Sequence, residues 1–235
     1  MEAARAGRVL GIDPGTLRMG FAVLDGERGA PRLVESGVLE APASATPARR
    51  LGQLFRALLV VVERTAPECM AIESSFFGKN ALSMLRLGEA RGCALAVAGS
   101  RDLPAFDYPP ARVKKSVTGN GNATKSQVAR ALVALLPGMT PVAELAWLDQ
   151  SDAIAVAWCH LEAAELARRH ARVDAAVAAA ALRNAPRSAD AGSRASLPRG
   201  GTKQAAFPGR SGGRAGDSVL DVTAAVARWQ SKRRR

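Results

Sequence analysis

The chain has 235 residues, of which 48% are hydrophobic, and a formal net charge of +12. This length allows one domain of about 150–200 residues plus an appendage. The positive charge favours a polyanionic partner, nucleic acid before membrane. The sequence has neither an apolar run of the roughly 18 residues that cross a bilayer nor a signal-peptide core, so it predicts a cytoplasmic protein without membrane contact. Three widely spaced cysteines argue against a disulfide framework or a zinc site.

The charge is unevenly distributed along the chain. Residues 1–172 hold 21 Lys and Arg against 17 Asp and Glu, a net of +4, whereas residues 173–235 hold 12 against 4, a net of +8. The segment 183–216 is rich in Gly, Ser, Pro, Ala and Arg, a composition typical of disorder. We therefore predict a folded domain at 1–172, a basic low-complexity linker at 173–216 and a short amphipathic basic helix at 217–235.

The first elements of the chain read as strands followed by a helix. Apolar runs at 9–12, 21–24 and 33–39 predict three strands in an antiparallel meander. Thr46 and Pro47 then have the pattern of a helix N-cap followed by proline in the first helical turn. Apolar residues at spacings of 3, 4 and 3 continue from Leu51, which predicts an amphipathic helix.

Helices and strands alternate after this point. The pattern predicts a buried strand at 69–73, a helix at 80–98, a short strand at 106–108, a loop at 119–122, a capped helix from Lys125 and a last core helix from about 148 to 169. Residues 175–182 are suited to extend that helix. The predicted elements begin with three strands and continue with alternating helices and strands. This order indicates an α/β fold with a mixed β-sheet flanked by helices.

Four acidic residues lie in otherwise apolar segments: Asp13, Glu73, Asp149 and Asp152. Burial of a lone carboxylate costs several kcal/mol unless it is paired or bound to a metal. Asp149 and Asp152 are three residues apart, so on a helix they share one face, although such a pair also occurs where acids complement a helix dipole. A divalent cation with oxygen ligands is the simplest partner for four such acids.

The motifs around these acids carry a resemblance. The segments Gly11-Ile12-Asp13-Pro14-Gly15, Ala71-Ile72-Glu73, Leu87-Gly88-Glu89-Ala90-Arg91-Gly92, Lys125-Ser126-Gln127 and Asp149…Asp152-Ala153 occur in the order found in the RuvC family of Holliday-junction resolvases. The resemblance covers about residues 8–165. It implies an RNase H-like fold, a homodimer, and Mg²⁺- or Mn²⁺-dependent nicking of two opposed strands at a four-way DNA junction during recombination and repair.

The resemblance also implies roles for residues and partners. The four acids match the metal-binding acids of the family, and the branch-migration proteins RuvA and RuvB are implied as partners. In a two-metal site, one ion activates a water and the other stabilises the leaving oxygen. The acids then act as ligands, and no side-chain nucleophile is needed.

The lysines of residues 1–172 are confined to the segment between two of the acids. Residues 1–172 contain only four, Lys79, Lys114, Lys115 and Lys125, and all lie between Glu73 and Asp149. One interpretation is an ordinary solvated surface, and the other is contact with DNA phosphates. Lys114 and Lys125 match family lysines near the DNA.

Two adjacent aromatic residues follow Glu73. In extended backbone Phe76 and Phe77 point to opposite faces, so one is expected in the core and the other at the surface. An exposed phenyl ring beside a nuclease site can stack against an unpaired base. Phe76 matches the family's aromatic at this position, while burial of both rings is the alternative.

Other functions stay open at this point. One is a different RNase H-like nuclease, for example one that cleaves RNA, and another is a catalytically silent junction-binding protein. A phosphotransferase is a third, because a turn like Asp13-Pro14-Gly15-Thr16 also occurs in actin-like kinases. That class requires further phosphate-binding loops, which the sequence does not display.

Overall fold

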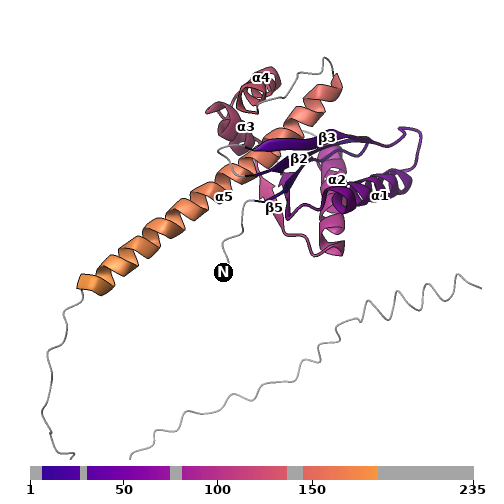
Figure 1. Ribbon diagram of the computed structural model, residues 1–235. Coiled ribbons are helices and arrows are strands. Elements are labelled where there is room, and N and C mark those ends of the chain that lie inside the picture. Colours follow the sequence, from indigo (N-terminus) through magenta and orange to yellow (C-terminus); the bar gives the residue numbers. More distant parts are fainter. Residues whose placement is uncertain (1–6, 27–30, 75–80, 137–144, 185–235) are drawn as a thin grey trace, which may run out of the picture. The chain divides into compact units, whose positions relative to one another are not determined.

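A five-stranded mixed sheet forms the centre of the molecule (Figure 1). The computed structural model describes residues 7–26, 31–74, 81–136 and 145–184, all within one unit that spans residues 1–185. The strands are β1 (Val9–Asp13), β2 (Arg18–Asp25), β3 (Arg32–Glu40), β4 (Cys69–Glu73) and β5 (Ala105–Tyr108). Their order is β3-β2-β1-β4-β5, with β1–β2 and β2–β3 antiparallel and β1–β4 and β4–β5 parallel.

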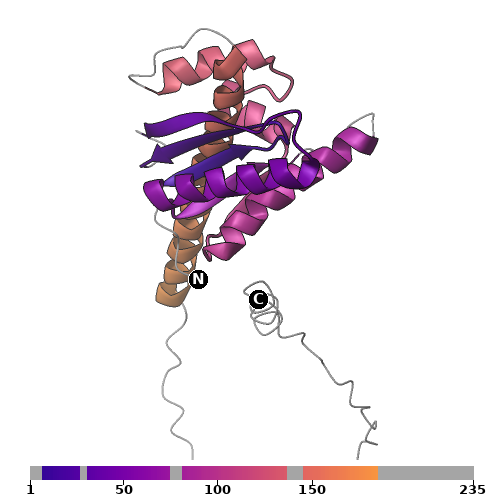
Figure 2. The same ribbon diagram turned by 90° about the vertical axis from the view of Figure 1, so that its right-hand side faces the viewer.

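Helices cover both faces of the sheet. They are α1 (Pro47–Thr65), α2 (Ala81–Ser100), α3 (Pro110–Thr118), α4 (Lys125–Leu135) and α5 (Leu145–Asn184). Helices α1 and α2 lie on one face, and α5 crosses the other with α3 and α4 packed beside it (Figure 2). The result is a three-layer sandwich in which α5 contacts β1 and β2.

Alternation along the strands divides the apolar residues between two cores, because successive strand side chains point to opposite faces. Leu10 and Ile12 of β1 pack with the α1 and α2 layer. Val9 packs with the α5 layer, where Ile154 and Leu161 are fully buried. Both faces of the central strand are thus covered, which leaves only its ends for polar chemistry.

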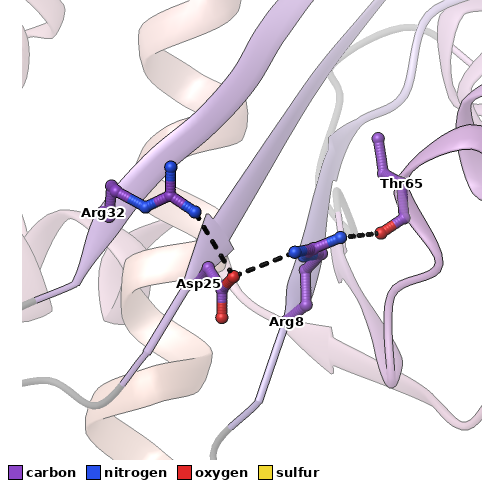
Figure 3. Close-up of polar contacts among 4 residues, drawn as sticks. All are labelled: Arg8, Asp25, Arg32 and Thr65. Carbon is purple, nitrogen blue, oxygen red and sulfur yellow. Dashed lines mark hydrogen bonds and ion pairs between the residues drawn. The ribbon is translucent and has the colours of Figure 1, made fainter.

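A polar network closes the end of the sheet at which β1 begins (Figure 3). Arg8 donates one hydrogen bond to the carbonyl oxygen of Thr65 at 2.6 Å and another to Oδ2 of Asp25 at 3.0 Å. Arg32 approaches the same oxygen at 3.7 Å. The guanidinium of Arg8 therefore caps the last turn of α1 and joins it to β2, so this end of the sheet is structural.

The elements predicted within the described ranges are confirmed, with two differences. The linker from residue 185 onward and the amphipathic helix predicted at 217–235 lie outside the described residues. Helix α3 was not predicted, since its nine residues contain only two buried apolar side chains, Val113 and Val117. Helix α5 is 40 residues long and continues to Asn184, beyond the predicted end near residue 169. Residues 173–184 are therefore helical, as the sequence allowed for residues 175–182, although the domain boundary was predicted at 172. This alanine-rich segment has high helix propensity. In the part of the chain described, no helix is long and apolar enough to span a bilayer.

Candidate active site

Two of the four acids end adjacent strands. β1 and β4 run parallel and pair Ile12 with Ile72, so the next residue on each strand, Asp13 and Glu73, reaches the same edge of the sheet. Both side chains are partly covered. They are hydrogen-bonded to each other. Parallel pairing therefore brings together two carboxylates that lie 60 residues apart in the sequence.

Helix α5 brings the other two acids to this edge. It lies so close to the sheet that a Cβ atom on Gly11 would be 2.2 Å from the carbonyl oxygen of Ala153. A Cβ on Gly20 would be 2.4 Å from the carbonyl oxygen of Asp149. Only glycine allows this approach of helix to strand. The two glycines thus set the position of Asp149, and of Asp152 one turn further along.

The electrostatics of the two buried acids favour binding of a cation. Burial, reinforced by the charges of Glu73 and Asp152, raises the pKa of Asp13 to about 8. Burial and the charge of Asp152 also raise the pKa of Glu73, although the hydrogen bond from Asp13 and the charge of Lys125 oppose that rise. Asp13 therefore keeps its proton to a higher pH than an ordinary carboxyl group does. Like charges held this close are unfavourable without a counter-ion.

Two cations contact the acids of α5. Nζ of Lys125 lies 2.5 Å from Oδ2 of Asp152, and Nε of Arg18 lies 2.9 Å from Oδ2 of Asp149. Burial opposes the charge of Lys125, but its hydrogen bond to Asp152 and the nearby carboxylates outweigh this and raise its pKa. Sequence reasoning missed Arg18. Its place at the first residue of β2, beside the end of β1, was the available signal.

The predicted lysines occupy two different surfaces. Lys125 opens α4, whose capping box is formed as predicted: Thr124 accepts a hydrogen bond from the backbone N–H of Gln127, and the Gln127 side chain accepts one from the backbone N–H of Thr124. On α3, the charge of Lys114 acts on Glu73 and lowers its pKa. The next residue, Lys115, is exposed and instead lines a cleft between α3 and α5.

Three predicted residues cannot be placed. Phe76, Phe77 and Lys79 lie outside the described residues. Their roles therefore remain predictions from sequence.

The donor set suits a hard divalent cation, since it consists of carboxylate oxygens. Within the described ranges, no three Asp, Glu, His or Cys side chains converge on one point as an ion would require. The ion pairs explain this, because Asp149 and Asp152 point to Arg18 and Lys125. An ion held by these two carboxylates would therefore have to replace Arg18 and Lys125 as their partners.

A mixed sheet in the order β3-β2-β1-β4-β5, with acids at the ends of β1 and β4 and on the helix packed across them, defines an RNase H-like nuclease. The comparisons with known proteins make this specific. Residues 9–160 match the model of the family "Crossover junction endodeoxyribonuclease RuvC". The chain belongs to this RuvC family.

Curated relatives agree with this assignment. The chain is 41% identical over 154 residues to the crossover junction endodeoxyribonuclease RuvC of Porphyromonas gingivalis, which covers 65% of this chain and 80% of that protein. It is 40% identical over 162 residues to the RuvC of Chloroflexus aggregans, which covers 69% of this chain and 97% of the relative. The match thus includes nearly the whole length of some relatives.

Solved structures show the same fold. The Thermus thermophilus RuvC structure aligns with a TM-score of 0.61 at 29% identity, covering 68% of this chain and 96% of that chain. T. thermophilus RuvC in complex with a Holliday junction substrate gives the same score and identity, covering 66% and 92%. The yeast mitochondrial Holliday junction resolvase Ydc2, at 17% identity and a TM-score of 0.50 over 68% and 80%, shares the fold. The protein is a crossover junction endodeoxyribonuclease and, like its family, metal-dependent.

Proposed function

We propose that the protein resolves Holliday junctions by nicking two opposed strands symmetrically, with Asp13, Glu73, Asp149 and Asp152 as its catalytic acids. One observation carries the proposal. The four acids come from three elements, β1, β4 and α5, and they gather at one edge of the sheet with two of them at raised pKa. Carboxylates that repel one another away from water destabilise the fold. A bound metal ion would offset this repulsion, so a metal site explains why the acids lie together.

The four acids would hold Mg²⁺, with Mn²⁺ as a substitute, and the number of acids suits two ions. Bound ions supply an activated water and stabilise the leaving oxygen. The protein itself contributes the geometry. Asp13 must release its proton, and Asp149 and Asp152 must leave Arg18 and Lys125. The two released cations then lie beside the acids and are free to bind the phosphate that is cut.

The remaining predicted residues would bind DNA around the site. Lys114 and Lys125 already lie within electrostatic range of the acids, which supports contact with phosphates next to the cut. Lys79 and Phe76 follow Glu73 closely in sequence. We propose that Lys79 contacts phosphate and that Phe76 stacks on a base unpaired at the crossover.

Symmetrical cutting of two strands requires two sites, and α2 offers a surface for a second copy. Its first two turns expose Leu82, Met84 and Leu85 by 53%, 40% and 61%. Gly88 and Gly92 follow on the same helix, and added Cβ atoms there would meet nothing within 4 Å. Several exposed large apolar side chains close together on one helix are typical of an interface between protein chains. We propose that a homodimer forms through α2.

The decisive experiment uses a synthetic immobile four-way junction with and without Mg²⁺. Paired nicks at symmetrical positions are expected only with the metal. An RNA–DNA hybrid of the same length tests the alternative of an RNase H-like enzyme on RNA. Cutting of the hybrid but not of the junction would reject the proposal, and junction binding without nicking would indicate a silent binding protein.

The dimer has its own test. Leu85→Glu is expected to yield a monomer in sedimentation and to uncouple the two nicks, since a charge in an apolar interface is costly. Val177→Glu is the matched control, because Val177 is 64% exposed on α5, and it should leave the dimer intact. Equal sedimentation of the two variants would exclude α2 as the interface.

The family resemblance also leads us to propose that the protein acts in the cytoplasm and cooperates with RuvA and RuvB.

A further inference from the structure

A cleft between α3 and α5 lies away from the acids. Its volume is about 450 Å³, and its lining includes the basic residues Arg112, Lys115 and Arg169. The two helices lie side by side (Figure 1). Nε1 of Trp158 on α5 donates a hydrogen bond to the carbonyl oxygen of Ser116 on α3 at 3.2 Å. The walls of the cleft are therefore fixed relative to each other.

The basic groups of the cleft are held in place but exposed. The guanidinium of Arg112 lies 5.4 Å from the ring centroid of Tyr108, within range of a cation–π interaction. Lys115 is exposed. The side chain of Arg169 is 66% exposed, although its Nε donates a hydrogen bond to Glu165 at 2.9 Å. All three cations are thus available to a ligand outside the protein.

Two acids, Glu162 and Glu165, also line the cleft. Glu165 is paired with both Arg168 and Arg169, each at 2.9 Å, so this group of three keeps a net charge of +1. With Arg112 and Lys115 opposed by Glu162, the cleft and its surroundings carry an excess of two positive charges. This balance favours an anion, and a polyanion most of all.

The position of the cleft relative to the acids favours an arm of the DNA substrate as the anion. Glu162 and Arg169 lie 10 and 17 residues beyond Asp152 on the same helix, which corresponds to about 15–26 Å along its axis. Duplex DNA rises 3.4 Å per base pair, so this distance corresponds to about 4–8 base pairs. Lys114 and Lys115 are consecutive residues of α3. The charge of Lys114 acts on Glu73, whereas Lys115 lines the cleft. One short helix therefore carries positive charge from the site to the cleft.

We propose that this cleft binds the phosphate backbone of a junction arm several base pairs from the crossover. The inference rests on the proposed function, because it assigns the DNA segment that lies beyond the cut. Arg169 lies past residue 160, where the match to the family model ends. The interaction would thus use a part of α5 that the family match does not include.

The test compares two variants of equal charge change in the full-length protein. Lys115→Gln/Arg169→Gln removes two cations from the cleft. Arg56→Gln/Arg101→Gln removes two from the α1 and α2 side of the sheet, where Arg56 is exposed and Arg101 is paired with Glu63. The cleft variant is expected to bind junctions more weakly, with a log–log salt dependence flatter by about 0.9 for each phosphate that the protein no longer neutralises. The control variant should bind as the wild type does.

Two further measurements separate charge from folding and locate the bound phosphates. In the charge-preserving variant Lys115→Arg/Arg169→Lys, the log–log salt dependence of junction binding should be as steep as in the wild type. A junction with uncharged methylphosphonate linkages about 4–8 base pairs from the crossover should weaken wild-type binding to the level of the cleft variant, and should not weaken the cleft variant further.

The outcomes are distinguishable. If the wild type neither binds nor nicks the junction, the proposed function fails and this inference with it. If the wild type nicks the junction but the cleft and control variants bind alike, the cleft inference alone is overturned. A flattened salt slope in the charge-preserving variant would also overturn it, because the effect would then not come from the charge that binds phosphate.

Discussion

Asp13 illustrates how a single residue can be unfavourable for the fold and useful for function. It lies partly buried beside Glu73 and close to Asp152, and its pKa rises to about 8. A carboxyl group with an ordinary role would be expected at its normal pKa, or lower if it were salt-bridged. The protein therefore keeps an electrostatic strain at this point, which a divalent cation would relieve.

Glu73→Gln tests the role of the acids. We expect nicking to fall by at least about a hundredfold, because loss of the proposed metal ligand would take away several kcal/mol of transition-state stabilisation. Junction affinity should stay the same or improve, since a negative charge near the DNA is removed. Single-turnover nicking and filter binding measure the two quantities.

Glu63→Gln is the matched control for this change, because Glu63 pairs with Arg101 on the other side of the sheet. It should nick at the wild-type rate. A Glu73→Gln protein that retains nicking within about tenfold of the wild type would show that the site is wrongly assigned.

His160 has a structural environment. Its Nδ1 is 2.8 Å from the hydroxyl of Tyr108 and its Nε2 is 3.3 Å from Sγ of Cys69. Its ring centroid lies 4.7 Å from that of Phe106. Burial lowers the pKa of His160 to about 4, so the imidazole is neutral at physiological pH and joins β4, β5 and α5.

This lowered pKa predicts a stability change with pH. Between about pH 6.5 and pH 4 the unfolded state binds a proton that the folded state refuses, so stability falls as the pH falls through this window. From about pH 7.5 to pH 5 the contribution of His160 is a decrease of about 2 kcal/mol. The acids with raised pKa act in the opposite direction, so the change must be measured as a difference.

The comparison is between the wild type and His160→Gln, which cannot titrate in this range. Chemical denaturation at both pH values should show the wild type losing about 2 kcal/mol more than the variant does. Parallel pH profiles of the two proteins would contradict the buried, neutral state of His160.

Among the elements, α5 decides the geometry of the site. Its first turns contact β1 and β2 through glycines that admit no side chain. The helix carries both Asp149 and Asp152, so a small displacement of α5 moves two of the four acids together. If these acids are catalytic, as proposed, the packing between helix and sheet sets the geometry of catalysis.

Gly20→Ala tests this dependence. The added methyl group would lie 2.4 Å from the carbonyl oxygen of Asp149, so α5 must shift by about an ångström or more. Such a displacement can cost about a hundredfold in rate together with about 1–3 kcal/mol of stability. Nicking and thermal melting of the variant measure the two effects.

Gly99→Ala is the control, since an added Cβ at Gly99 meets nothing within 4 Å in helix α2. It should nick normally and melt at the same temperature or slightly higher. Normal nicking by Gly20→Ala would mean that α5 can reposition without disturbing the acids.

At the scale of the whole molecule, the positive charge lies mostly outside the described residues. Residues 185–235 contain 11 Lys and Arg against 3 Asp and Glu, a net of +8. Such a segment adds sequence-independent attraction to DNA. We therefore expect this tail, residues 185–235, to add affinity for DNA and the unit that contains the sheet to carry the chemistry.

Truncation after Asn184, where α5 ends, is expected to leave a folded and active nuclease. Junction binding should weaken, and its log–log salt dependence should flatten by about 0.9 for each phosphate that the tail neutralises in the full-length protein. Circular dichroism, nicking and binding at several salt concentrations check the three expectations. Unfolding of the truncated protein would refute the assignment of the tail, and an unchanged salt slope would refute its binding to DNA.

The local patterns of the sequence were sufficient for the strands and for four of the five helices in the described ranges, and they singled out the four acids as candidates for the site. These features depend on neighbours in the chain: apolar spacing, the N-cap at Thr46, the capping box at Thr124, and an acid that ends an apolar run. Helix α3 was not predicted, because so short a helix is stabilised mainly by tertiary packing. Val113 and Val117 supply that packing only in the folded protein.

Only the tertiary structure decided how distant segments meet. Parallel pairing of β1 with β4 put Asp13 beside Glu73, and close packing at Gly11 and Gly20 added the acids of α5. The pairing of Arg18 with Asp149, the raised pKa of Asp13 and the basic cleft between α3 and α5 have the same origin. Each of these features arises because residues far apart in sequence lie close together in space. Local spacing and composition do not reveal which distant residues meet.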